Sequence, residues 1–545
     1  MSQVTDLNGA SKGRGVDGPR GDLLWGTIPG LVAAAAQDFG DREAIVDGDV
    51  RITFAGLGAA VDQSTRAAMA AGVERGDRVA IWAPNLWEWI VAVLGVQGAG
   101  GVIVPINTRF KGREAAYVLE RSGAELLFTV AGFLDIDYVK LLRDEIGGDP
   151  VAQTVILRGP NPPGTQSWND YILGSDAVSM AQLKVRADMA DRSDLSDIMF
   201  TSGTTGRPKG VMTTHAQTLR VFEVWSRLVG LREGDRYLIV NPFFHTFGYK
   251  AGFVACLMRG ATIVPHAVFD VPAVLKRIAE ERISVLPGPP TLYQSILNVP
   301  DRGDLSSLRL AVTGAAVVPV ELIKRMRSEL TFETILTAYG LTESTGTVSM
   351  CREGDDAETI ANTSGCAIPD TEVRIVDEGN KEVARGEPGE IVVRGYNVMQ
   401  GYYQDPQATA DAIDGGGWLH TGDVGVMDDR GYIKITDRKK DMFIVGGFNA
   451  YPAEIENLLR CHPGVRDVAV VGMPDDRLGE VGMAFVVARP GTEVTGPEIV
   501  DWARAEMANY KVPRAVELVD RLPTNATGKV RKDELRARAA RRGSR

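Results

Sequence analysis

Residues 201–210 have the composition of a phosphate-binding loop. They read Thr-Ser-Gly-Thr-Thr-Gly-Arg-Pro-Lys-Gly, after a strand-like segment at 197–200 and before a segment that we expect to be a helix. Glycines let backbone N–H groups turn toward an anion, hydroxyl side chains add donors, and Lys209 adds a mobile positive charge. The order does not fit the Walker A motif, which needs a second glycine five residues after its first one, where this chain has Pro208. This disfavours a P-loop kinase or ATPase. The plain alternative is a polar surface loop.

Seven further motifs follow this loop. They lie at residues 242–248, 313–316, 339–343, 418–423, 437–441, 446–449 and 523–529. One such motif would carry little weight, but seven in a fixed order with consistent spacing are specific.

Together the motifs resemble those of the adenylate-forming superfamily, which includes acyl-CoA synthetases, luciferases and stand-alone adenylation domains. The resemblance covers residues 24–535. It implies an α/β fold: a large N-terminal domain of stacked α/β sheets with a β-barrel-like subdomain, and a small, mobile α+β C-terminal domain. It also implies that a carboxylic acid and ATP give acyl-AMP and pyrophosphate, and that the thiol of coenzyme A then gives acyl-CoA and AMP.

The resemblance assigns the ATP site residue by residue. Glu343 would hold Mg²⁺, a hard cation that prefers oxygen ligands, and Thr342 would reach the α-phosphate. Tyr339 would stack on adenine, while Asp423 and Arg438 would contact the ribose. The other expected nucleotide contacts are Thr201, Ser202, Gly203, Thr204, Thr205, Gly206, Lys209, Gly314, Ala315 and Ala316.

By the same resemblance, Lys529 enters the site during adenylation and bridges the acyl carboxylate and the α-phosphate. The C-terminal domain then rotates about residues 437–441, with Lys440 at the pivot. Rotation would bring Gly446, Gly447 and Phe448 against the site, where the pantetheine arm of coenzyme A needs room. His245 would gate the acyl pocket, although its apolar neighbours also fit an ordinary core histidine.

The acid pocket is expected to follow His245 and Glu343. The candidates are Thr246, Phe247, Lys250, Tyr293, Gly314, Ser344, Thr345 and Gly346. Lys250 stands in an otherwise apolar run. We weigh two hypotheses for it: a lysine that snorkels at a helix edge, or a contact to a polar end of the substrate such as a ketone.

Residues 241–257, 286–295, 310–319 and 337–343 resemble actinobacterial synthetases of steroid catabolism. Those enzymes load coenzyme A onto the propanoate of a methylhexahydroindanedione. Medium- or long-chain fatty acids are the alternative substrates, and an acyl-AMP ligase that loads a carrier protein is the alternative activity. A luciferase-type oxygenase is a weaker alternative only because that activity is rare on this scaffold. A nucleotide sensor on a decayed enzyme fold is weaker because Lys529, Glu343 and Asp423 are all present.

Composition and patterning set the scaffold that must hold these residues. A chain of 545 residues is too long to fold around one hydrophobic core, so at least two domains are expected. There are 60 Lys and Arg against 71 Asp and Glu, a net charge of −11, which argues against nucleic acid as a partner. Helical and β-branched segments, among them an expected strand at 285–287, alternate to residue 365, which predicts parallel sheets. After residue 365 short strands with turns between them predict an antiparallel barrel or meander. Residues 87–106 predict a buried helix–strand unit rather than a membrane span, and residues 44–54 predict a hairpin.

We expect a leader (1–25), a large domain (26–436), a hinge (437–441) and a small domain (442–545). Four cysteines without paired spacing fit a reducing, cytoplasmic setting. No signal peptide or membrane segment is expected. The expected partners are a small carboxylic acid, ATP, Mg²⁺ and coenzyme A, with a homodimer suggested by the resemblance.

Overall fold

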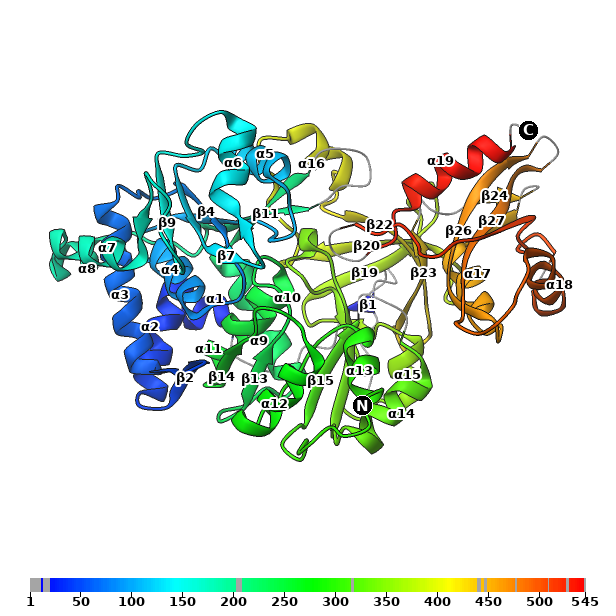
Figure 1. Ribbon diagram of the computed structural model, residues 1–545, viewed down its shortest axis with the longest axis horizontal. Coiled ribbons are helices and arrows are strands. Elements are labelled where there is room, and N and C mark those ends of the chain that lie inside the picture. Colours follow the sequence, from blue (N-terminus) through cyan, green and yellow to red (C-terminus); the bar gives the residue numbers. More distant parts are fainter. Residues whose placement is uncertain are drawn as a thin grey trace. The chain divides into compact units, whose positions relative to one another are not determined.

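The computed structural model describes residues 11–12, 20–201, 208–314, 318–438, 443–445, 448–475, 478–507, 509–525 and 529–543. The chain packs into two compact units. Unit 1 comprises residues 1–373 and 393–419, and unit 2 comprises residues 374–392 and 420–545. Figure 1 shows the course of the chain in each.

Unit 1 contains an eight-stranded sheet. Its order is β10 (Gln166–Ser167), β9 (Gln153–Ile156), β6 (Leu126–Thr129), β4 (Arg78–Trp82), β5 (Val102–Pro105), β11 (Leu195–Thr201), β12 (Lys209–Thr214) and β21 (Gly401–Tyr402). The strands from β10 to β11 are parallel, and β12 and β21 pair antiparallel at one edge. The helices among these strands include α3 (Phe54–Ala70), α4 (Trp87–Gly98), α5 (Gly112–Ser122), α6 (Tyr138–Ile146), α7 (Trp168–Leu173) and α8 (Met180–Asp188).

A second layer of unit 1 pairs β13 (Arg236–Ile239), β14 (Thr262–Pro265), β2 (Glu43–Asp47) and β3 (Val50–Thr53). Beside it lie β15 (Leu310–Gly314), β16 (Thr334–Tyr339), β17 (Ser349–Met350) and β18 (Cys366–Ala367). Val285 bridges β13 and β15 in parallel, so the expected strand at 285–287 is reduced to one paired residue. The helices here are α2 (Ile28–Phe39), α9 (His215–Leu228), α11 (Ala255–Arg259), α12 (Val271–Glu281), α13 (Pro290–Leu297), α14 (Val320–Glu329) and α15 (Ala357–Asn362).

Several expected elements are confirmed. Residues 87–106 form α4 and β5, and α4 is buried around nearly its whole circumference, as a core helix should be. The predicted hairpin is β2 and β3, with Gly48 at φ +60° in the turn.

The prediction of a helix directly after the phosphate loop is wrong. Residues 209–214 form β12, so the loop closes a β-hairpin, and α9 begins only at His215.

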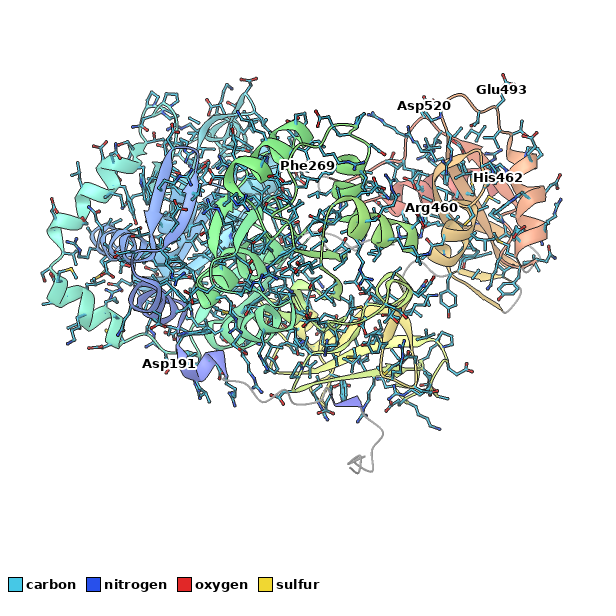
Figure 2. All side chains as sticks on the ribbon, turned by 90° about the horizontal axis from the view of Figure 1, so that it is seen from below. Asp191, Phe269, Arg460, His462, Glu493 and Asp520 are labelled. Atoms are coloured by element: carbon cyan, nitrogen blue, oxygen red, sulfur yellow. The ribbon has the colours of Figure 1, made fainter. Side chains whose placement is uncertain are left out.

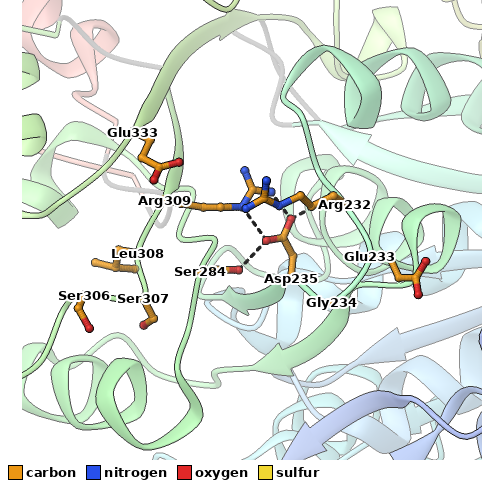
Figure 3. A pocket seen from close by; sticks show the side chains of 10 residues that line it. All are labelled: Arg232, Glu233, Gly234, Asp235, Ser284, Ser306, Ser307, Leu308, Arg309 and Glu333. Carbon is orange, nitrogen blue, oxygen red and sulfur yellow. Dashed lines mark hydrogen bonds and ion pairs between the residues drawn. The ribbon is translucent and has the colours of Figure 1, made fainter.

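The amino ends of the parallel strands are tied together by what we call the amino-edge clasp: Asp235, Ser284 and Arg309 (Figure 3). Arg309 Nε and Ser284 Oγ each donate to Asp235 Oδ1 at 2.8 Å. These residues precede β13, Val285 and β15. In α/β sheets ligands bind at the carboxyl ends of strands. The polar hollow around the clasp, lined also by Arg232 and Glu333, is therefore at the wrong edge for a catalytic site.

A third sheet has the order β1 (Ser11–Lys12), β19 (Thr371–Val376), β20 (Gly389–Gly395), β22 (Leu419–Met427) and β23 (Ile433–Arg438). The pairs β1–β19 and β22–β23 are antiparallel. This agrees with the change from alternating helices and strands to short strands that the sequence shows after residue 365.

The end of unit 2 is a sheet of β25 (Phe448–Ala450), β24 (Phe443–Val445), β27 (Gly479–Ala488) and β26 (Val465–Asp475), with β28 (Ala515–Leu518) beside β27. One core joins it to α17 (Pro452–Leu459) and α18 (Gly496–Glu506), and a second core joins it to α19 (Lys532–Gly543). Arg460 and His462, labelled in Figure 2, follow α17; Arg460 Nη2 reaches Asp467 Oδ1 at 3.3 Å. In the described ranges, no helix is both long enough and apolar enough to cross a bilayer.

Candidate active site

The two ends of the phosphate loop lie opposite each other. Thr201 ends β11 and Lys209 begins β12, and the two residues are paired in the antiparallel register. Tyr117 on α5 supports the far end, since its hydroxyl donates to the carbonyl of Pro208 at 3.1 Å. Ser202, Gly203, Thr204, Thr205 and Gly206 lie outside the described residues.

Glu343 lies next to this hairpin. It sits in a short 3₁₀ turn (Thr342–Ser344) after β16. The hydroxyls of Thr201 and Tyr402 donate to its Oε1 at 3.4 and 2.9 Å. Burial and the Glu343 carboxylate raise the pKa of Tyr402, which keeps this hydroxyl a donor. The structure thus brings together two predicted residues, Thr201 and Glu343, and adds Tyr402.

The groups around Glu343 fit Mg²⁺. The Glu343 carboxylate and the two hydroxyls that donate to its Oε1 present only oxygen atoms, the ligand type that Mg²⁺ prefers. Among the residues that the structure describes, no three His, Cys, Asp or Glu side chains are grouped as a metal cage. Mg²⁺ does not need one, because it is commonly held by one or two carboxylates together with substrate phosphates.

The expected adenine side lies at the carboxyl ends of β15 and β16. Gly314 and Ala338 are paired there, and Tyr339 is the next residue. A Cβ on Gly314 would lie 2.7 Å from the carbonyl oxygen of Ala338, so only glycine permits this approach of the strands. Ala315 and Ala316 lie outside the described residues.

His245 is held at the start of a helix. Its Nδ1 accepts a hydrogen bond from the N–H of Phe247 at 3.2 Å, so the neutral ring carries its proton on Nε2. Asn85 clamps the preceding segment, accepting from Phe243 N at 2.8 Å and donating to Asn241 O at 2.9 Å. The imidazole is exposed, but the surrounding protein desolvates it and lowers the pKa of His245. Its contact with water limits this lowering.

Two predicted pocket residues from distant segments meet. Gly346, with φ +98°, lies against Thr246: a Cβ at Gly346 would be 3.1 Å from Thr246 Cβ. It would also lie 3.3 Å from Phe222 Cζ. Thr246 is buried and Phe247 is half-buried. The missing side chain therefore lets the backbone of Gly346 pack closely against Thr246 and Phe222.

This arrangement predicts the effect of Gly346→Ala. We expect the KM for the acid to rise about 10-fold, because the added methyl group would press on Thr246, which is expected to line the acid pocket, with the KM for ATP unchanged. The matched control is Gly354→Ala. Gly354 has φ +91° with nothing within 4 Å of a Cβ, so it reproduces the backbone strain of about 1–3 kcal/mol without the contact. Equal acid KM values for the two variants would contradict the pocket assignment.

Lys250 and Tyr293 are core residues. The Lys250 Nζ lies 2.9 Å from Asp197 Oδ1, and both side chains are fully buried. Burial lowers the pKa of Lys250, and the Asp197 carboxylate opposes that change. The Tyr293 hydroxyl donates to the carbonyl of Leu286 at 2.7 Å. Neither side chain has accessible surface, so in this structure neither faces a substrate. The snorkelling hypothesis for Lys250 is wrong for the same reason.

Ser344 and Thr345, both also buried, are engaged within unit 1. Ser344 Oγ accepts from Leu341 N at 2.9 Å, and Thr345 Oγ1 donates to Asn397 O at 2.7 Å. Thr345 has φ +56°, an uncommon conformation for a β-branched residue. These bonds fix the turn that presents Glu343 and Gly346.

Unit 2 aligns the two expected ribose contacts. Asp423 on β22 and Arg438 on β23 are opposite each other in the antiparallel register. The loop before Asp423 is held by Glu390, which accepts from Gly422 N at 3.1 Å and contacts His420 Nδ1 at 3.1 Å. Phe448 begins β25, whereas Gly446, Gly447 and Lys440 lie outside the described residues.

Lys529 is exposed in unit 2. Its N–H donates to Asn525 Oδ1 at 2.9 Å, and Asn525 N donates back to its carbonyl at 2.8 Å. Thr524 and Val530 pair as an antiparallel bridge. An exposed side chain suits a residue that must reach a substrate.

Two protein-family models match this chain. Residues 32–403 match the AMP-binding enzyme model, and residues 454–529 match the model of the AMP-binding enzyme C-terminal domain. The chain belongs to the AMP-binding enzyme family. Within that family it is an ATP-dependent acyl-CoA ligase, with the α/β fold of adenylate-forming enzymes.

The relatives are similar over nearly their whole length. A "3-[(3aS,4S,7aS)-7a-methyl-1,5-dioxo-octahydro-1H-inden-4-yl]propanoyl:CoA ligase" of Rhodococcus jostii (strain RHA1) is 50% identical, over 94% of this chain and 98% of its own. The Mycobacterium tuberculosis protein of the same name is 48% identical over 94% and 98%. Among solved structures, the anthranilate CoA ligase AuaEII with anthranoyl-AMP has a TM-score of 0.84 and 28% identity, covering 96% of this chain and 99% of that one.

Proposed function

We propose that this chain converts a steroid-derived bicyclic propanoate, a 3-(7a-methyl-1,5-dioxo-octahydroinden-4-yl)propanoate, into its acyl-CoA thioester. The observation that carries the proposal is the pair of relatives with this named activity, at 50% and 48% identity over almost the full chain.

In the first half-reaction, a carboxylate oxygen of the acid attacks the α-phosphorus of ATP. The bond from that phosphorus to the bridging oxygen breaks, and pyrophosphate leaves with the electron pair. Lys209 and the hydroxyl of Thr201 would hold the outer phosphates, and Lys529 would bridge the carboxylate and the α-phosphate. Fixed positive charge matters most here, because the transition state concentrates negative charge. Mg²⁺ held by Glu343 would neutralise phosphate charge.

In the second half-reaction, the thiol of coenzyme A loses its proton and its sulfur attacks the acyl carbon. The bond from that carbon to the AMP oxygen breaks, and AMP leaves with the electron pair. A thiol ionises readily enough that no strong base is required. His245, with its proton on Nε2, would line the passage, and residues 446–448 would admit the pantetheine arm after rotation at residues 437–441.

The proposal is tested by measuring pyrophosphate release and acyl-CoA formation from a panel of acids. The panel contains the bicyclic propanoate, octanoate, palmitate and ferulate, each with and without coenzyme A. We expect kcat/KM for the bicyclic acid to exceed the others by about 100-fold, since each mismatched group costs about 1–3 kcal/mol. A fatty acid that performs equally well would overturn the substrate, and an acyl-AMP released only to a carrier protein would overturn the acceptor.

We further propose a cytoplasmic setting, in keeping with four cysteines that form no disulfide in the described residues. Homodimerisation stays a prediction of the family resemblance, and sedimentation of the purified chain tests it.

A further inference from the structure

We propose that Tyr402 positions both the magnesium ligand and the phosphate lysine of this ligase. Its hydroxyl orients the Glu343 carboxylate, and its ring supports the Lys209 ammonium. The inference rests on the proposed roles of Glu343 and Lys209. It adds Tyr402, which has no role in the proposed function.

The first contact is to Glu343. The Tyr402 hydroxyl donates to Glu343 Oε1 at 2.9 Å, while the longer contact from Thr201 to the same oxygen is 3.4 Å. A hydrogen bond to a charged acceptor is among the stronger ones in proteins. Because Oε1 is taken, the bond fixes the rotation of the carboxylate and leaves Oε2 as the oxygen that faces a cation. Groups that orient a metal ligand in this way strongly affect metal affinity.

The second contact is to Lys209. Its Nζ lies 4.9 Å from the centre of the Tyr402 ring, within the range of a cation–π interaction. Strand pairing explains the approach. Tyr402 on β21 is opposite Val211 on β12, and Lys209 lies two residues before Val211 on the same face. The two side chains are therefore diagonal neighbours across the pair of strands.

The backbone around Tyr402 is firmly held. Tyr403 N donates to Gly210 O at 2.7 Å, and Tyr402 N donates to Thr409 Oγ1 at 2.9 Å. Met399 N donates to the carbonyl of Glu343 at 2.9 Å. One short segment thus contacts both the end of the phosphate loop and the turn that carries Glu343. Tyr402 is suited to keep these two parts in fixed relation.

ATP binding without any acid separates the two roles, because no turnover occurs. We measure ATP affinity by calorimetry in excess Mg²⁺ and in EDTA. For Tyr402→Phe, we expect unchanged affinity in EDTA and a gain on adding Mg²⁺ that is about 10-fold smaller than in the wild type. For Tyr402→Leu, which also removes the ring, affinity in EDTA should fall about 3-fold as well.

Tyr403→Phe is the matched control, and it should behave as the wild type. Thermal unfolding of each variant checks the fold, and Tyr402→Phe alone decides the question if Tyr402→Leu does not fold. A Tyr402→Phe variant with the full magnesium effect, or with equal losses in Mg²⁺ and EDTA, overturns the inference. Wild-type protein that binds no ATP would instead overturn the proposed function.

Discussion

Replacing Lys529 with alanine is expected to slow acyl-adenylate formation by about 10²–10³-fold, because a fixed cation at a developing negative charge contributes about 3–4 kcal/mol to the transition state. The second half-reaction should keep its rate, since attack by the thiol on a preformed acyl-adenylate does not need this charge. Pyrophosphate exchange measures the first step. Conversion of added acyl-adenylate to acyl-CoA measures the second.

Lys532→Ala is the control for general loss of positive charge. Lys532 is three residues away and its Nζ pairs with Glu456 Oε1 at 3.0 Å. We expect this variant to lose some stability and to adenylate at the wild-type rate. Equal loss of both half-reactions in Lys529→Ala, or equal adenylation defects in the two variants, would contradict the assigned role.

Replacing Lys250 with methionine is expected to lower the free energy of unfolding by about 3–5 kcal/mol, because Asp197 would be left as an unpaired buried charge. The ion pair joins β11, which ends at Thr201, to the π-helical turn Tyr249–Val254 that follows His245 and Thr246. Denaturant-induced unfolding measures the loss.

Two variants make this measurement specific. Lys276→Met removes an exposed lysine whose Nζ is 3.8 Å from Glu280 Oε1, and it should cost no more than about 0.5 kcal/mol. Adding Asp197→Asn to Lys250→Met should recover most of the lost stability, because no buried charge then lacks a partner. If Lys250→Met costs no more than Lys276→Met, the ion pair does not stabilise the fold.

Much of the scaffold could be predicted from the sequence because local patterns decide it. The apolar run at residues 87–106 could only be a buried helix and strand once its glycines and Pro105 were taken into account. The hairpin at residues 44–54 followed from the Asp47–Gly48 turn. The motif order also led to the family, which relatives at 50% and 48% identity confirm.

The sequence could not reveal contacts between distant segments. Tyr402 lies 59 positions from Glu343, and only the pairing of β21 with β12 brings it there. Lys250 looked like an edge residue because its partner, Asp197, is far away in sequence. The strand at 209–214 was missed because the phosphate loop suggested a helix, although Val211, Thr213 and Thr214 are β-branched.

The amino-edge clasp has a consequence for how this enzyme can change. Asp235 and Arg309 secure the strands at the rim away from the substrate, where Asp235 is almost fully buried. The turns that we propose to bind the acid follow the carboxyl ends of β13 and β16 and share none of these bonds. Variants at residues 246, 247 and 346 can therefore change which acid is accepted without weakening the sheet. A substitution of Asp235 would instead destabilise the sheet and so reduce activity toward every acid.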